Sequence, residues 1–133
     1  MPVPLFVKWN KDDECNYPIL DEQHWGLVAT INSLHYFIQK GWAIKDLKPT
    51  LVILREYVIF HLKTEQMILV RNNIPKDILS EVLKYHKDFI SNLEEETHDA
   101  IEHDDPEQLL SYLTRWWQGH KKNFHAKLAQ YTA

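Results

Sequence analysis

Several features are scarce or missing in this chain of 133 residues, and each absence excludes a class of protein. There is one cysteine, Cys15, so no disulfide can form within the chain, and this fits a reducing cytosol. No apolar run is long enough to span a membrane. The formal charge of −4 provides no basic footprint for nucleic acid. We therefore expect a cytoplasmic protein whose partners include neither a membrane nor a nucleic acid.

The chain also lacks the patterns of a secreted, repetitive or β-rich protein. Its first residues, Met1-Pro2-Val3-Pro4, do not contain a basic region followed by an apolar segment, so we expect no secretory signal. No stretch alternates between apolar and polar residues with period two, and no internal repeat is visible. A chain of this length is typical of one domain with a buried core, and we expect a single domain over residues 1–133.

Apolar residues recur at helical spacing in four stretches, which predict four helices. We expect the first helix over about residues 21–40, with Asp21 as its N-cap and Gly41 as its stop signal. The second opens between Asp46 and Pro49 and ends near residues 72–73. The third begins at Pro75 and ends near the acidic residues 94–96. The fourth has Asp105 as N-cap and runs close to the C-terminus.

Four helices of similar length joined by short links favour an all-α, up-down-up-down four-helix bundle. Residues 1–19 contain Pro2, Pro4 and Pro18, so we expect them to form an ordered arm laid over the bundle at residues 20–133.

His61 and Glu65 are four residues apart in the second expected helix, so they share one face. An imidazole nitrogen and a carboxylate oxygen suit iron, zinc or manganese. Since neighbouring helices in such a bundle are antiparallel, His24, His86 and His120 from the other three helices can reach the same layer. The spacing therefore predicts a metal site inside the bundle.

Four motifs together resemble those of hemerythrins and bacteriohemerythrins. Asp21-Glu22-Gln23-His24 with Ile31-Asn32-Ser33-Leu34 is similar to the opening of that family. His61-x-x-x-Glu65 resembles its second-helix motif, Trp116-x-x-x-His120 resembles its last-helix motif, and the arm with Trp9 also fits. The resemblance implies a non-haem di-iron protein in which the diferrous pair binds O2 reversibly, with O2 or another diatomic molecule as its partner.

Carried over by motif, the resemblance implies a set of metal ligands. His24 and His61 match two histidines on one iron, and Glu65 matches a carboxylate that bridges both irons. His86 and His120 match histidines of the third and fourth helices. The chain departs from the family at Val82, where the family has another histidine, and at His125, where it has a bridging aspartate. The ligand candidates that remain are His24, His61, Glu65, His86, His120 and His125.

These departures favour a site with less negative charge than the family's, in which one ion held by three or four ligands is credible. We expect a first place built from His24, His61, Glu65 and His125, and a weaker second place at His86 and His120 with Glu65 as the bridge. Residues 120 and 125 differ by roughly 140° on a regular helix, so a π-bulge or a sideways approach would be needed for both to face inward.

Each candidate also has a purely structural interpretation. His86 can be a core histidine bonded to a backbone carbonyl, and His125 can be a histidine favoured by the dipole at a helix C-terminus. Surface or loop positions explain His35, His98 and His103. We expect Tyr57 and Trp116, one turn before ligand candidates, to be walls of the pocket or hydrogen-bonding partners of the ligands.

Three functions follow from the sequence. The first is a hemerythrin-like iron protein that binds O2 for storage, transport or sensing, with one or two iron ions. The second is an atypical protein with a mononuclear iron or zinc site and no reversible O2 carriage. The third is an interaction bundle whose site has decayed. An enzyme is not expected, because no nucleophile–base pair or cofactor motif is visible.

Overall fold

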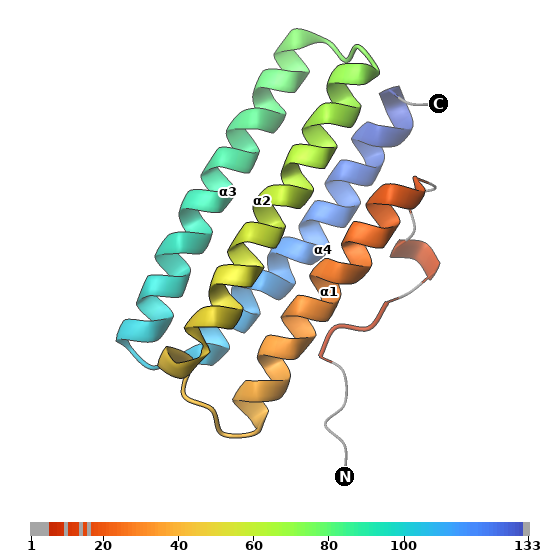
Figure 1. Cartoon of the computed structure of the whole chain (residues 1–133). Helices are drawn as coiled ribbons and strands as arrows, with labels where there is room; N and C mark the ends of the chain where they lie inside the picture. The colour runs from red at the N-terminus through yellow and green to blue at the C-terminus, as the bar shows by residue number, and fades with distance from the viewer. Residues whose placement is uncertain (1–5, 10, 14, 16, 132–133) are drawn as a thin grey trace.

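Four α-helices dominate the described part of the chain: α1 (Pro18–Gln39), α2 (Lys48–Arg71), α3 (Lys76–Glu102) and α4 (Pro106–Tyr131). Two short 3-10 helices, η1 (Lys11–Asp13) and η2 (Ile44–Leu47), precede α1 and α2. The computed structural model describes residues 6–9, 11–13, 15 and 17–131, without the side chains of 12, 125–129 and 131. Successive long helices run in opposite directions, side by side (Figure 1). The predicted all-α four-helix bundle is confirmed.

The helix starts follow the local signals in the sequence. Pro18 stands at the beginning of α1 and Pro106 opens α4, where a missing backbone N–H costs no helical hydrogen bond. Asp105 Oδ1 accepts a hydrogen bond of 3.2 Å from the backbone N–H of Gln108, as predicted for an N-cap. The predicted start of α1 was wrong, because the helix begins at Pro18 and Asp21 lies in its first turn, whereas its end at Gln39 is close to the predicted stop at Gly41. Asp21 Oδ1 instead accepts a 2.8 Å hydrogen bond from the backbone N–H of Cys15.

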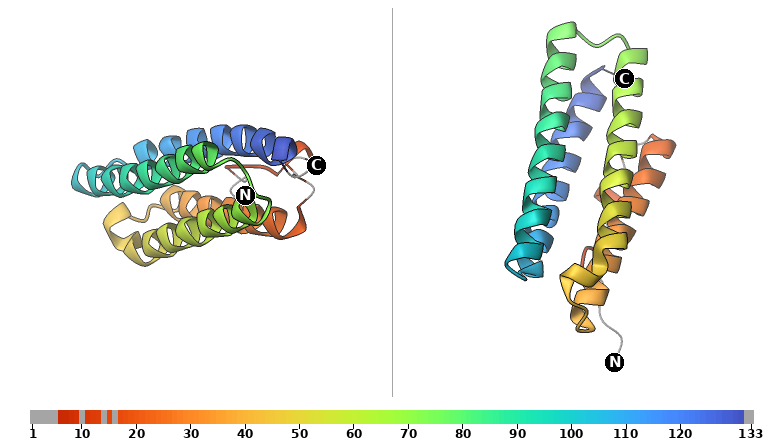
Figure 2. Two further views of the ribbon diagram at one scale, coloured as in Figure 1. Left: turned by 90° about the horizontal axis from the view of Figure 1, so that it is seen from above. Right: turned by 60° about the vertical axis from the view of Figure 1, so that its left-hand side comes forward.

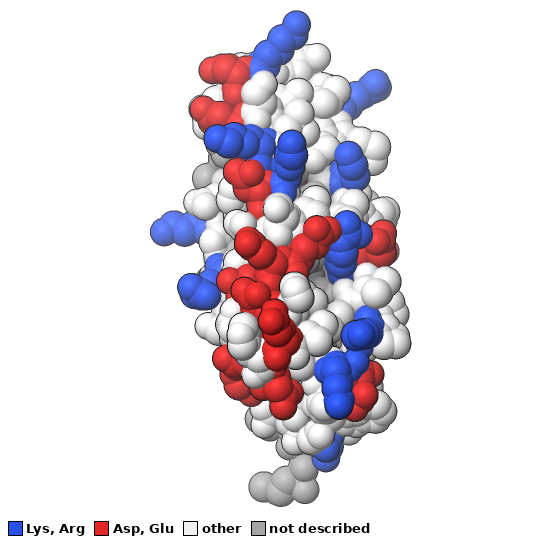
Figure 3. Space-filling view, turned by 90° about the vertical axis from the view of Figure 1, so that its left-hand side faces the viewer, with Lys and Arg blue, Asp and Glu red and all other residues white. Residues whose placement is uncertain are grey.

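The predicted end of α3 was also wrong, because the helix continues past the acidic residues 94–96 to Glu102, whereas Pro75 precedes its first residue as predicted. Leu93 and Ala100, seven residues apart, are both buried, and their packing in the core carries the helix onward. Glu94 and Glu95 stay exposed on the outer side of this helix. The face of the bundle on the α3 side carries a central band of acidic side chains with basic ones around it (Figure 3).

The described part of the N-terminal arm packs against the bundle. The backbone N–H of Val7 donates to Asn32 Oδ1 at 2.7 Å, and Asn32 Nδ2 donates back to the Val7 carbonyl at 2.8 Å. The ring of Trp9 stacks on Trp25 and Trp117, with centroid distances of 4.8 and 6.2 Å. The described residues of the predicted arm therefore lie against the bundle, whereas residues 1–5, 10, 14 and 16 lie outside the described residues and residues 18–19 belong to α1.

The apolar core is divided into two clusters along the length of the bundle. The large cluster lies towards the α1–α2 and α3–α4 connections and includes Leu34, Leu93 and Trp117. The small cluster lies towards the α2–α3 turn, and its buried members are Leu20, Leu69, Ile74, Val82 and Phe124. Figure 2 shows the helices from above, with α1 and α2 as one adjacent pair and α3 and α4 as the other. None of the described helices is both long and apolar enough to cross a membrane.

Candidate metal centre

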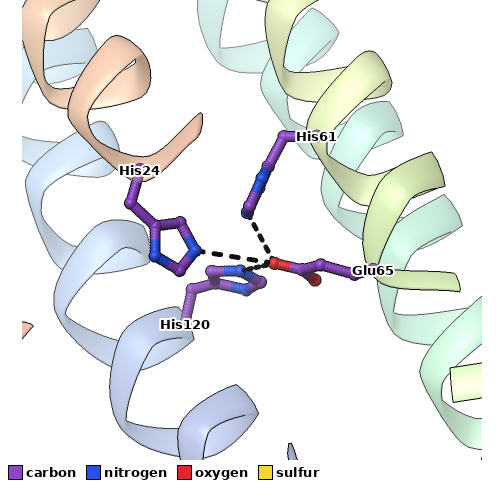
Figure 4. Close-up of side chains that lie close together, drawn as sticks. All are labelled: His24, His61, Glu65 and His120. Atoms are coloured by element: carbon purple, nitrogen blue, oxygen red, sulfur yellow. Dashed lines mark hydrogen bonds and ion pairs between the residues drawn. The ribbon is translucent and has the colours of Figure 1, made fainter. Parts of the chain in front are cut away.

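Three histidines and one glutamate meet in the layer between the two apolar clusters. His24 comes from α1, His61 and Glu65 come from α2, and His120 comes from α4 (Figure 4). His24, His61 and Glu65 have no exposed surface, and His120 is 2% exposed. Each residue offers one ligand atom, and these four atoms lie within 4.8 Å of one another. We call these four residues the metal cluster, because such a group could hold a metal ion.

One carboxylate oxygen is the centre of the metal cluster. Glu65 Oε1 lies 2.5 Å from His61 Nε2 and 2.5 Å from His120 Nε2, and His24 Nε2 is 3.8 Å away. The i,i+4 spacing on α2 places His61 beside Glu65, as the sequence predicted. The bundle brings the other two nitrogens to the same oxygen, so imidazoles from three helices point at a single carboxylate.

The ionisation of the cluster suits a metal ion. Burial lowers the pKa of His24 to about 4, so its imidazole is neutral at pH 7. Burial alone would raise the pKa of Glu65, but His120, whose Nε2 lies 2.5 Å from Oε1, holds it well below its usual value. A neutral imidazole and an ionised carboxylate are the states in which these groups coordinate a metal. The donor set therefore fits a transition-metal ion.

Aromatic rings enclose the metal cluster. His120 is stacked between Trp116 and Phe124, with centroid distances of 4.7 and 5.6 Å, and Trp117 meets His24 edge-on at 5.1 Å. Trp116, which we expected to be a wall of the pocket or a hydrogen-bonding partner, stacks on His120. These rings cover parts of His24 and His120, and where a buried site holds little water the attraction between a cation and Glu65 is stronger than in water.

His86 approaches the other oxygen of Glu65. Its Nε2 lies 3.4 Å from Glu65 Oε2, and its Nδ1 lies 3.0 Å from Gln66 Nε2. His86 is 2% exposed, so it is buried beside the metal cluster but contacts a different carboxylate oxygen from the other three histidines. Val82, one turn before His86, is buried in the small cluster.

His120 occupies the place that the sequence analysis gave to His125. Its Nε2 reaches the same Glu65 oxygen as His61, instead of a separate place with His86. His125 lies within α4, but its side chain is outside the described residues. His98 and His103 are exposed, as expected, whereas His35 is half-buried and stacks on Phe6 at 4.4 Å.

A cavity of about 450 Å³ lies beside the metal cluster, between α3 and α4. His86 and His120 form part of its wall, together with Glu81, Val82, Tyr85, Asn123 and Phe124. A small molecule in this cavity would lie against the two histidines.

The sequence analysis did not identify the polar side chains that hold the histidines. Gln23 Oε1 lies 3.0 Å from His61 Nδ1, and Gln23 Nε2 donates to Thr64 Oγ1 at 3.0 Å. Tyr57, expected near the pocket, donates its hydroxyl to the Gln23 carbonyl at 2.8 Å. Gln23 is one residue before His24, and Thr64 is three residues after His61. Polar residues so close to ligand candidates were the signal that could have revealed them.

A second group of possible ligand atoms shares His24 with the metal cluster. Cys15, Asp21 and His24 each offer one atom within 4.8 Å of the others. Burial and a hydrogen bond to Asp21 raise the pKa of the Cys15 thiol to about 12, which disfavours the thiolate that a metal requires. The metal cluster is therefore the better candidate.

Comparison with the models of known protein families finds no match to this chain, and comparison with curated proteins finds none either. The resemblance to hemerythrins therefore depends on the sequence motifs alone.

Proposed function

We propose that this protein binds one divalent transition-metal ion, iron or zinc, between His24, His61, His120 and Glu65. The observation that carries the proposal is the approach of His61 Nε2 and His120 Nε2 to one buried oxygen of Glu65, each at 2.5 Å. A cation placed between these residues would interact with all four donor atoms together.

The charge of the metal cluster supports a divalent ion. Three imidazoles contribute no negative charge when neutral, and Glu65 contributes one. Two ferric ions would therefore be poorly compensated in this dry interior, whereas one divalent ion would leave a single positive charge. Zinc accepts four such ligands in a tetrahedral site, and iron accepts additional ligands beyond these four.

Reconstitution with a single metal tests this proposal. The chain is loaded anaerobically with ferrous iron or with zinc, freed of excess metal, and its metal content per chain is counted. We expect one ion per chain, and we expect His61→Ala to abolish retention because it removes one of the closest donors to Glu65. His98→Ala, at an exposed position on α3, is the matched control and should retain the ion. If His61→Ala keeps the same metal content, the proposed site is wrong.

A second candidate function is O2 binding by an iron-loaded, hemerythrin-like site. Two observations favour it: His86 lies 3.4 Å from the second oxygen of Glu65, and the adjoining cavity of about 450 Å³ gives a diatomic molecule access to His86 and His120. In this alternative a second iron would be held by His86 and His120, with Glu65 as the bridge. The chain's own contribution would be an aromatic wall that keeps water out.

Optical spectra separate the two candidates. Two irons per chain and a visible charge-transfer band that appears in air and disappears when O2 is removed would support O2 binding. One tightly held ion with a spectrum insensitive to air would support the mononuclear site. If the protein retained no metal, the result would support the third function, an interaction bundle whose metal site has decayed. Val82→His introduces the histidine that hemerythrins have at the matching position. We expect this variant to bind a second metal ion more tightly, at His86 and His120. An unchanged number of ions per chain would count against the alignment of the motifs.

A further inference from the structure

Two glutamines flank the metal cluster, one beside His61 and one beside His86. We propose that Gln23 and Gln66 hold these two histidines in opposite tautomers, so that His61 turns a lone pair towards Glu65 as a metal ligand and His86 turns an N–H group towards it. The role of His61 rests on the proposed function, whereas the tautomers do not depend on whether a metal is bound.

The tautomer of His61 follows from a chain of hydrogen bonds that begins on the backbone of α2. Thr64 Oγ1 donates its only proton to the Phe60 carbonyl at 3.2 Å, so it can only accept from Gln23 Nε2. This fixes the amide of Gln23, whose oxygen must then face His61 Nδ1 at 3.0 Å. An amide oxygen only accepts, so the proton of the neutral ring is on Nδ1.

The consequence is a lone pair on His61 Nε2, which points at Glu65 Oε1 from 2.5 Å. Two lone pairs at this distance repel each other, so a proton or a metal ion must lie close to them. Gln23 is 5% exposed and Thr64 is 7% exposed, so water does not compete for these bonds. Gln23 therefore prepares His61 Nε2 to coordinate a cation.

Tyr57 and Gly26 fix the backbone that carries Gln23. The Tyr57 hydroxyl donates to the Gln23 carbonyl at 2.8 Å, across the contact between α2 and α1. A Cβ atom at Gly26 would collide with the end of the Tyr57 ring. The close approach of the two helices thus holds Gln23 at the height of His61.

Gln66 imposes the opposite arrangement on His86. Its amide nitrogen, Nε2, lies 3.0 Å from His86 Nδ1 and donates to it. The ring proton of a neutral His86 is therefore on Nε2, which faces Glu65 Oε2 at 3.4 Å. A nitrogen that carries a proton has no lone pair for a metal, so His86 turns an N–H group, and not a ligand atom, towards the carboxylate.

The opposite tautomers of His61 and His86 determine how many ions the metal cluster holds. Glu65 Oε1 faces the three histidines of the metal cluster, whereas Oε2 makes no hydrogen bond among the described residues and lies 3.4 Å from His86 Nε2. With Oε2 facing an N–H group, the carboxylate offers one oxygen to one ion. A second ion would need both the lone pair of His86 and the second carboxylate oxygen, so Gln66 keeps the site mononuclear.

Nuclear magnetic resonance measures the tautomers directly. The full chain, labelled with 15N in its histidines, is studied metal-free at alkaline pH and again with zinc, by long-range 15N–1H correlation. We expect His61 to carry its proton on Nδ1 and His86 to carry its proton on Nε2. The same tautomer in both residues would overturn the proposal. Because the metal-free spectrum gives the answer, failure to bind metal would refute the proposed function without affecting this test.

Variants of Thr64 test the support of His61. Thr64→Val removes the hydroxyl that fixes Gln23, and changes to groups that orient a ligand lower metal affinity by about 10- to 100-fold. Thr64→Ser keeps the hydroxyl and should restore the affinity. Zinc affinity is measured by competition with a chelator, alongside the melting temperature of the metal-free protein. A similar loss of affinity in both variants, or none in Thr64→Val, would contradict the positioning role of Gln23.

Gln66→Glu tests the role of His86. A carboxylate only accepts, so it would draw the ring proton to Nδ1 and turn a lone pair of His86 towards Glu65. We expect the His86 tautomer to reverse and the zinc content to rise from one ion to two per chain. Gln66 is half-buried and can accept a charge without unfolding the bundle. A Gln66→Glu chain with an unchanged His86 tautomer and one zinc ion would overturn the proposal.

Discussion

The two apolar clusters on either side of the metal cluster differ greatly in size. Among the described side chains, nineteen buried apolar residues form the large cluster and five form the small one. Full burial of one aliphatic or aromatic side chain contributes roughly 1.5–3 kcal/mol, so most of the hydrophobic stabilisation lies in the large cluster. The small cluster also borders the cavity of about 450 Å³, through Val82 and Phe124.

This difference explains how the bundle tolerates a buried charge. Glu65 has no exposed surface, and burial of a carboxylate is costly unless it is paired. The large cluster holds α1, α2, α3 and α4 together at one end, and the metal cluster then joins them near the other. We infer that the large cluster determines global stability, whereas the ion mainly tightens the end of the bundle that holds the small cluster.

The unequal contribution of the two apolar clusters to stability is tested most strongly by creating a cavity in each of them. Leu34 and Leu20 both lie in α1 with no exposed surface, the first in the large cluster and the second in the small one. Replacing a buried leucine by alanine lowers the free energy of unfolding by about 2–5 kcal/mol, and the loss is smallest where neighbouring side chains can move into the cavity. We expect Leu34→Ala to lower the free energy of unfolding by about 4 kcal/mol and Leu20→Ala to lower it by about 2 kcal/mol, both measured by unfolding in urea. Equal losses in the free energy of unfolding would show that the two ends of the bundle contribute equally to its stability.

Metal loading should act on the two ends unequally. At a free zinc concentration 100 times the Kd, the free energy of unfolding should rise by about 2.7 kcal/mol, because the ion binds only the folded chain. Hydrogen exchange locates the effect: amides near Leu69 and Ile74 should slow more on loading than amides near Leu34 and Leu93. Uniform slowing throughout the bundle would contradict a local role for the ion, and a chelator-treated sample is the control.

A smaller effect is expected where α1 meets α2 at the border of the metal cluster. Gly26→Ala adds a methyl group that collides with Tyr57, and overpacking of this kind costs about 1–3 kcal/mol. Gly119→Ala, in α4, meets open space and should instead stabilise the bundle by about 0.5–1 kcal/mol. The melting temperatures of both variants test this prediction. A gain in stability for Gly26→Ala would show that Tyr57 moves aside freely.

The smallest predicted perturbation uses Cys15 as a reporter, because it is half-buried against the small cluster. Burial and the hydrogen bond to Asp21 raise the pKa of its thiol from 9.0 to about 12, so at neutral pH the thiolate is about a thousandfold scarcer than in an ordinary cysteine. Alkylation by iodoacetamide should be correspondingly slow and should accelerate as pH rises. Leu20→Ala should speed it more than Leu34→Ala, whereas rapid reaction in the wild-type chain would refute this environment.

The sequence predicted the helices wherever local signals mark them. Pro49 and Asp105 with Pro106 placed the starts of α2 and α4 correctly. The end of α3 was missed because residues 94–96 look like a solvated terminus, and only tertiary packing of Ala100 extends the helix beyond them. The start of α1 was missed because Pro18 was assigned to the arm.

The metal cluster was predictable as a set of residues but not as an arrangement. Spacing placed His61 beside Glu65, yet nothing in the sequence indicates that His120 would meet the same carboxylate oxygen and that His86 would face the other one. That outcome depends on helix rotation and side-chain packing around Trp116 and Phe124. The orienting role of Gln23 likewise depends on a contact between two helices.

A crystal structure of the zinc-loaded chain, with anomalous scattering recorded at the zinc edge, tests the central claim most directly. The account predicts one strong anomalous peak per chain, coordinated by His24, His61, His120 and one oxygen of Glu65, with His86 near the other oxygen. No peak between these residues, or a peak held by other side chains, would contradict it.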